Sequence, residues 1–139
     1  MFFAVPIATD TPTPSSRVLV VDDDGLNLRV AARLLKDLGC QGALAPDGLT
    51  ALRLAGEQNF DMVLLDVNMP GFNGQDTLQA LRSRPETARH RMPVVMITGH
   101  DDEATRNHYM ALGADGFLVK PLGLEALRQV MRNVGVTIN

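Results

Sequence analysis

Short apolar runs alternate with amphipathic stretches along most of the chain. The runs over residues 18–21 and 62–65 are made of Val, Leu and Met, a pattern typical of strands that are buried on both faces of a parallel sheet. Between such runs, apolar residues recur at helical spacing, as over 28–38, where Gly39 marks the end of the helix. The predicted strands cover residues 17–21, 42–45, 62–65, 93–97 and 117–119.

The alternation of strand and helix, repeated five times, indicates the fold class. Parallel strands that follow one another are joined by right-handed crossovers, which place helices on both faces of the sheet. We therefore predict an α/β fold, a (βα)5 doubly wound, five-stranded parallel sheet. Asn73 is predicted to cap the third helix, and the acidic residues 101–103 are predicted to lie at the start of the fourth.

The two ends of the chain differ from this regular pattern. Residues 1–16 contain a short apolar run and then a Thr/Pro/Ser-rich stretch, which predicts a tail or linker. The regular pattern occupies residues 17–134, and residues 135–139 remain as a short C-terminal tail. We therefore expect one domain between two tails, which agrees with a length of 139 residues.

Composition excludes several classes of function. The formal net charge is −3 and there is no long run of Lys or Arg, so direct nucleic-acid binding is not expected. No apolar run approaches the roughly 20 residues of a membrane span, so no membrane contact is expected. The single cysteine excludes an internal disulfide and a multi-cysteine metal site. A basic stretch is interpreted as a solvated face, and it contains Arg82, Arg84, Arg89 and Arg91.

Polar residues follow four of the five predicted strands. Asp22, Asp23 and Asp24 follow the first strand, Asp66 the third, Thr98 and Gly99 the fourth, and Lys120 and Pro121 the fifth. In doubly wound sheets, ligands bind beyond the carboxyl ends of the strands. The sequence therefore predicts one pocket that contains several carboxylates, an ammonium group and a hydroxyl group.

This set of side chains suits a metal ion and a phosphoryl group. Carboxylates held close together repel one another, and Mg²⁺, which prefers a few carboxylates, a carbonyl and water, removes that conflict. The metal, Lys120 and Thr98 can each take one oxygen of a phosphoryl group, and one carboxylate can be the nucleophile.

Four segments carry a resemblance to a known family. They are VVDD at 20–23, LLDVNMPG at 64–71, MITG at 96–99 and GADGFLVKP at 113–121. In order and spacing they resemble the signature blocks of the receiver domain of two-component response regulators. The resemblance implies a flavodoxin-like sheet with strand order 2-1-3-4-5. It also implies a domain that promotes its own phosphorylation and dephosphorylation and is not otherwise an enzyme.

The resemblance also implies a role for each matching residue. Asp66 would be the phosphoacceptor. Asp23, Asp66 and the backbone carbonyl of Asn68 would bind Mg²⁺, with Asp22 acting largely through water. Thr98 and Lys120 would bind phosphoryl oxygens.

Further positions concern the switch and the lifetime of the phosphoryl group. Thr98 and Phe117 would form the switch, and the Lys120–Pro121 peptide bond would be cis. Asn68, Gly99 and His100 would tune the access of water to the phosphoryl group.

The kind of receiver is left open between two readings. The Asp triplet with Asn27 and Val30, and the character of residues 1–16, resemble a receiver fused to a hybrid histidine kinase. The alternative is a free-standing response regulator. The implied partners are the phosphohistidine domain of a histidine kinase and, in a relay, a histidine phosphotransfer domain, and the implied location is the cytoplasm.

Two other classes fit the residues less well. Haloacid-dehalogenase-type phosphatases also use an Asp nucleophile with Mg²⁺, but their motif is Asp-x-Asp, and Asn68 stands at the second position here. A flavodoxin-type FMN site needs a phosphate-binding loop after the first strand, where three Asp residues would repel phosphate.

Overall fold

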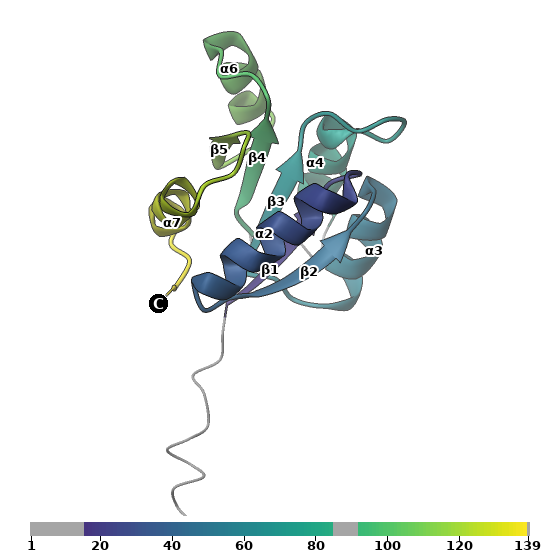
Figure 1. Ribbon diagram of the computed structural model, residues 1–139. Helices are drawn as coiled ribbons and strands as arrows, with labels where there is room; N and C mark the ends of the chain where they lie inside the picture. Colours follow the sequence, from purple (N-terminus) through teal and green to yellow (C-terminus); the bar gives the residue numbers. More distant parts are fainter. Residues whose placement is uncertain (1–15, 85–91, 139) are drawn as a thin grey trace, which may run out of the picture.

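The computed structural model describes residues 16–84 and 92–138. Its five strands form one parallel sheet in the order β2-β1-β3-β4-β5 (Figure 1). Both the predicted fold class and the strand order are therefore confirmed. The strands are β1 Arg17–Val21, β2 Gln41–Ala45, β3 Met62–Asp66, β4 Val94–Thr98 and β5 Gly116–Val119, and the helices are α2 Gly25–Asp37, α3 Gly48–Glu57, α4 Gly74–Ser83, α6 Glu103–Ala111 and α7 Leu124–Asn133.

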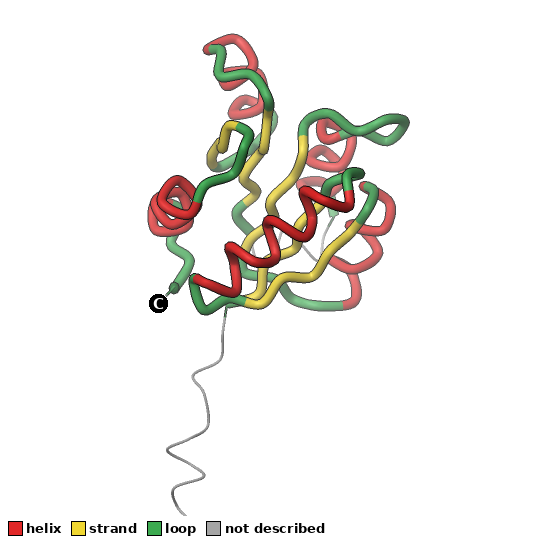
Figure 2. Tube along the Cα trace, in the orientation of Figure 1, coloured by secondary structure: helices red, strands yellow, loops and turns green. Residues whose placement is uncertain are grey.

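The helices cover the sheet on both faces (Figure 2). Alternate residues of each strand point to opposite faces, so Val18 and Val20 pack with α2 and α7 in one core. Leu19 and Val21 point the other way and pack with residues of α3, α4 and α6 in a second core. All five residues of β3 and of β4 are buried, which explains why their sequences are apolar without alternation.

Side-chain caps start the helices at the carboxyl ends of the strands. Asp24, Asp47 and Asp102 each accept a hydrogen bond from a backbone N–H in the first turn of α2, α3 and α6. Asn73 caps α4 as predicted, in a reciprocal capping box with Asp76. These caps satisfy N–H groups that a helix start leaves without an intrahelical partner.

The interpretation of the basic stretch as a solvated face is wrong for Arg82. Its guanidinium lies 2.6 Å from Oδ2 of Asp115 and donates to the carbonyl oxygens of Gly113 and Met92, at 3.0 and 2.8 Å. The Arg82 side chain is only 17% exposed. It therefore ties the end of α4 to the amino ends of β4 and β5. Arg89 and Arg91 lie outside the described residues.

The packed part of the chain extends beyond residue 134. Val136 is buried in the core beneath α2 and α7, and Ile138 packs against the same core. At the other end, the hydroxyl of Ser16 donates to the carbonyl oxygen of Thr137 at 2.7 Å. The rest of the predicted tail, residues 1–15, lies outside the described residues. Within the described ranges, no helix has the length and apolar character needed to cross a membrane.

Candidate functional site

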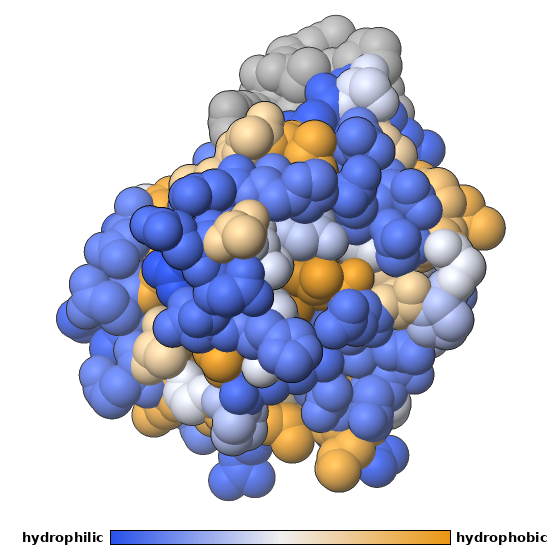
Figure 3. Space-filling model, turned by 90° about the horizontal axis from the view of Figure 1, so that it is seen from above, coloured by the Kyte–Doolittle hydropathy of each residue, from blue (hydrophilic) through white to orange (hydrophobic). Residues whose placement is uncertain are grey.

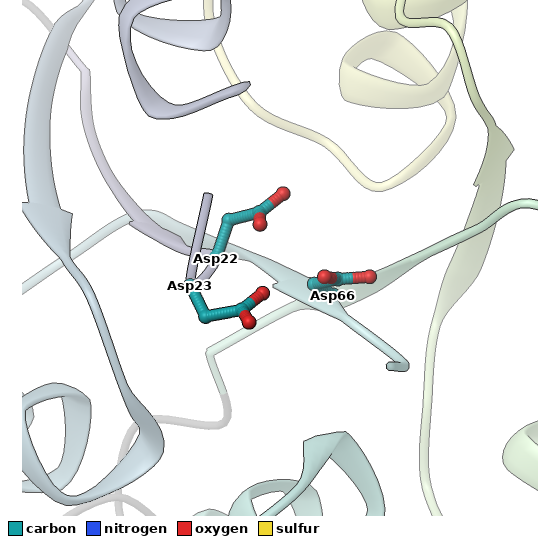
Figure 4. Close-up of side chains that lie close together, drawn as sticks. All are labelled: Asp22, Asp23 and Asp66. Atoms are coloured by element: carbon teal, nitrogen blue, oxygen red, sulfur yellow. The ribbon is translucent and has the colours of Figure 1, made fainter. Parts of the chain in front are cut away.

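Three aspartates meet where β1 and β3 end. β1 and β3 are adjacent and parallel, with Val21 beside Leu65, so Asp22 and Asp23 follow β1 at the level where Asp66 ends β3. One carboxylate oxygen from each of the three lies within 4.8 Å of the others (Figure 4). Asp22 and Asp66 are buried, and Asp23 is exposed. The sequence predicted this cluster.

Lys120 brings a positive charge to the cluster from β5. Its Nζ lies 3.1 Å from Oδ1 of Asp66 and 3.9 Å from Oδ2 of Asp22. The backbone N–H of Lys120 donates to the carbonyl oxygen of Thr98 at 2.8 Å, which fixes the end of β5 beside the end of β4. The Lys120–Pro121 peptide bond is cis, as expected.

The electrostatics of the cluster are unbalanced. Burial raises the pKa of Asp66 above its usual range, and the negative charge of Asp22 raises it further, while Lys120 and the N–H of Asn68 act in the opposite direction. One ammonium group faces three carboxylates. The site therefore retains excess negative charge that a bound cation would neutralise.

The set of donor atoms fits a hard divalent cation. Carboxylate oxygens from three residues converge on one space, and Mg²⁺ in proteins is bound through one or two carboxylates with water. The N–H of Asn68 donates to Oδ1 of Asp66 at 3.2 Å, so the backbone at Asn68 lies next to the cluster. The role of the Asn68 carbonyl as a metal ligand stays a prediction.

Thr98 lies buried at the end of β4, close to the exposed segment that follows it. Its Oγ accepts a hydrogen bond from the backbone N–H of His100 at 3.1 Å. Gly99 and His100 are exposed, and a side chain at position 99 would meet no atom within 4 Å. The site is therefore open on this side, where the sequence predicted residues that control the entry of water.

Phe117 is half-buried on β5 and contacts two residues of α6. The ring of Tyr109 meets it edge-on, with centroids 6.1 Å apart, and the guanidinium carbon of Arg106 lies 5.9 Å from its ring centroid. Neither contact was predicted from the sequence. The spacing of Arg106 and Tyr109, three residues apart on a predicted helix, was the available signal.

An apolar cleft of about 450 Å³ adjoins the acidic cluster. Figure 3 views the molecule from the carboxyl ends of the strands and shows apolar side chains near the centre among mainly polar ones. Leu26 and Val30 of α2 line the cleft and are 60% and 41% exposed. The sequence did not predict this cleft, although Asn27 and Val30 are two of the residues that carry the resemblance to hybrid-kinase receivers. Its other lining residues are Asp22, Asn27, Ile97, Gly99, Lys120, Pro121 and Leu122.

Comparisons with known proteins agree with this geometry. The family model described as response regulator receiver domain matches residues 18–132. Chemotaxis protein CheY from Pseudomonas aeruginosa is 36% identical over 127 residues, and the match covers 88% of this chain and 98% of that protein. Sensor protein GacS from Pseudomonas syringae pv. syringae is 32% identical over 127 residues, and the match covers 91% of this chain but only 14% of that protein.

A solved structure adds a metal-bound example. The receiver domain of sensor histidine kinase PA1611 from Pseudomonas aeruginosa PAO1 has a magnesium ion coordinated in its active site cleft. It matches this structure with a TM-score of 0.76 and 27% identity, over 88% of this chain and 99% of that chain.

Proposed function

This chain belongs to the family of response regulator receiver domains, and from that membership we propose that Asp66 is the residue that accepts the phosphoryl group in two-component signalling. The observation that carries this proposal is the position of Asp66. Its carboxylate is buried at the carboxyl end of β3, within hydrogen-bond distance of Lys120 and beside Asp22 and Asp23. No other buried carboxylate in the described residues combines these neighbours.

The proposed step is a direct transfer to oxygen. A carboxylate oxygen of Asp66 forms a bond to phosphorus while the phosphorus–nitrogen bond of a phosphohistidine breaks, and the electron pair of that bond returns to the imidazole. Lys120 and Thr98 hold oxygens of the phosphoryl group. The chain thus promotes its own phosphorylation, and in the later dephosphorylation water attacks the phosphorus and the Asp66 carboxylate leaves.

Asp22, Asp23 and Asp66 are the residues proposed to hold Mg²⁺, together with the backbone carbonyl of Asn68. When bound, the cation neutralises charge on the carboxylates and on the phosphoryl oxygens. Without it, the excess negative charge of the cluster repels a phosphoryl donor.

Two further groups of residues act after transfer. Thr98 and Phe117 form the proposed switch, in which the Thr98 hydroxyl leaves the N–H of His100 and turns toward the phosphoryl group. Asn68, Gly99 and His100 border the open side of the site and set how readily water reaches the phosphoryl group. An open mouth with no bulk at Gly99 favours a lifetime of minutes rather than hours.

The apolar cleft is proposed as the place where a phosphohistidine domain docks. Leu26 and Val30 expose apolar surface next to Lys120 and Asp22, so a helix that packs its apolar face there would bring its histidine to Asp66. The domain proposed for this role covers residues 17–134. The partner is the phosphohistidine domain of a histidine kinase or, in a relay, a histidine phosphotransfer domain.

Two settings for the domain are consistent with the relatives. The likeness to sensor protein GacS supports a receiver within a hybrid histidine kinase, where Asp66 passes its phosphoryl group onward. The likeness to chemotaxis protein CheY along nearly its whole length supports a free-standing regulator. We favour the hybrid setting because the Asp triplet, Asn27 and Val30 resemble the residues of receivers fused to hybrid histidine kinases. We propose that the domain lies in the cytoplasm.

Labelling with acetyl phosphate tests the proposed acceptor. The wild-type chain with Mg²⁺ should gain one acid-stable, base-labile phosphoryl group, and Asp66→Asn should gain none. EDTA should abolish labelling of the wild type. Full labelling of Asp66→Asn would overturn the assignment.

Two apolar substitutions test the docking surface separately. Leu26→Ser should slow transfer from a phosphohistidine domain by about tenfold, yet leave labelling by acetyl phosphate unchanged. Leu49→Ser is the matched control, because Leu49 is equally exposed, at 63%, but lies outside the cleft. Equal effects of the two variants would contradict docking at the cleft.

A further inference from the structure

Arg106 connects the segment after β4 to the aromatic residue of the proposed switch. Its guanidinium lies over the ring of Phe117 and forms an ion pair with Asp101, which lies between Thr98 and α6. We propose that Arg106 is a positioning residue of the switch, which holds Phe117 and the segment 99–102 in the resting arrangement. This proposal rests on the proposed function, in which Thr98 and Phe117 move on phosphorylation.

The segment 99–102 is held at both of its ends. At the first end, the N–H of His100 donates to the Thr98 hydroxyl at 3.1 Å, a hydrogen bond that is lost if that hydroxyl turns toward Asp66. At the other end, Asp102 accepts a hydrogen bond from the N–H of Thr105 at 2.7 Å and caps α6. Asp101 lies between these two ends. Among the described contacts of its side chain, the ion pair with Arg106 is the one that joins it to α6. A movement of the segment that starts at Thr98 therefore strains or breaks that pair.

Phe117 is held from the same helix. Tyr109 is buried and meets the ring edge-on, while Arg106 lies over the ring from a position one turn earlier on α6. Rotation of Phe117 would leave Tyr109 in the core but would end the contact with the guanidinium. One side chain thus touches both parts that the switch is expected to move, the segment after Thr98 and the ring of Phe117.

The sign of the effect follows from the arrangement observed. The hydroxyl of Thr98 is engaged with the segment 99–102, so the contacts of Arg106 favour the arrangement without a phosphoryl group. Removal of the contacts should raise the population of the activated arrangement. Because coupling between two sites is reciprocal, affinity for a phosphoryl analogue should rise with it. An exposed ion pair and a cation–π contact to a half-buried ring each contribute a modest free energy, so the expected rise in affinity is about three- to tenfold.

The proposal is tested by the affinity of the full chain for beryllofluoride, which serves as the phosphoryl analogue, in the presence of Mg²⁺. Arg106→Met keeps the aliphatic stem and should bind beryllofluoride about three- to tenfold more tightly than the wild type. Its unliganded amide resonances over residues 99–120 should move toward the positions of the beryllofluoride-bound wild type. Asp101→Asn should have part of the effect, and Arg106→Lys should lie near the wild type because it keeps the charge.

Arg53→Met provides the matched control. Arg53 also forms an exposed ion pair on a helix, with Glu57 at 3.5 Å, but contacts no part of the proposed switch, and its substitution should change neither readout. Unchanged affinity and unchanged resonances in Arg106→Met, or a rise equal to that of Arg53→Met, would overturn the role of Arg106. If the wild type itself does not bind beryllofluoride, the proposed function fails and this inference fails with it.

Discussion

Two clusters of charged side chains lie at opposite ends of the sheet, and they differ in how their charges are balanced. At the amino ends of β4 and β5, the guanidinium of Arg82 donates to the carboxylate of Asp115 and to the carbonyl oxygens of Gly113 and Met92. Asp115 also accepts the N–H of Val94 at 2.9 Å. Among the described residues of this cluster, the carboxylate thus has a guanidinium and a backbone N–H as partners within the chain.

The cluster at the carboxyl ends is not matched in this way. Asp22, Asp23 and Asp66 share the ammonium group of Lys120, and burial among like charges raises the pKa of Asp66. A cluster that is balanced internally stabilises the fold, whereas one that carries excess charge favours the binding of a cation. The comparison therefore separates a structural ion pair from a functional site within one sheet.

The largest expected effect is the loss of the balanced pair. Arg82→Met would remove the guanidinium from the partly buried carboxylate of Asp115 and would end three hydrogen bonds to charged or carbonyl oxygens. Because the pair is only partly buried, the expected loss of unfolding free energy is about 2 kcal/mol. Urea denaturation measures this cost. Arg53→Met, which loses only an exposed pair with Glu57, should cost less than about 1 kcal/mol.

Binding of Mg²⁺ by Arg82→Met shows whether the two ends of the sheet are independent. Because Arg82 is at the far end of the sheet, the folded fraction of this variant should bind Mg²⁺ with wild-type affinity. A loss of Mg²⁺ affinity equal to that of a variant in the acidic cluster would mean that the two ends are not independent.

The next effect concerns the metal and not the fold. Asp23→Asn removes one exposed carboxylate from the cluster and should weaken Mg²⁺ binding by at least about tenfold, with little change in stability. Calorimetric titration measures the affinity. Asp24→Asn is the control, because Asp24 lies next in sequence but caps α2, and Asn caps a helix as well as Asp. Equal losses in both variants would contradict the assignment of Asp23.

The smallest effect is a gain in stability. The raised pKa of Asp66 means that its ionisation opposes folding, so this penalty is absent below the ordinary carboxyl pKa of about 4 and complete above the raised value. Without Mg²⁺, Asp66→Asn should therefore be more stable than the wild type at pH 7, by less than the amount that Arg82→Met loses. The difference should shrink as pH falls toward 4. Thermal unfolding across that range measures it, and a wild type more stable than the variant at pH 7 would contradict the unbalanced charge.

Much of the fold could be predicted because local pattern determines it. The aliphatic runs of β1, β3 and β4 and the cap at Asn73 depend on neighbouring residues alone, and they are found where predicted. The strand order depends on which strands pair across the sheet, and periodicity does not contain that information. It came from the resemblance to the receiver family.

The site was predicted in part, for a related reason. Asp22 and Lys120 follow strands and Asp66 ends one, so the topology alone brings them together. The burial of Arg82 depends on its partner Asp115, 33 residues further along the chain, and nothing near Arg82 in sequence indicates it. The contacts of Arg106 and the cleft beside Leu26 likewise arise from how helices pack on the sheet.

Chemical mapping can identify the carboxylate that carries the phosphoryl group, which we claim is that of Asp66. The wild-type chain is phosphorylated by acetyl phosphate with Mg²⁺, the acyl phosphate is reduced with borohydride, and the modified residue is located by peptide mass spectrometry. We predict conversion to homoserine at position 66 and at no other carboxyl residue. Modification at Asp22 or Asp23, with position 66 unmodified, would contradict the claim.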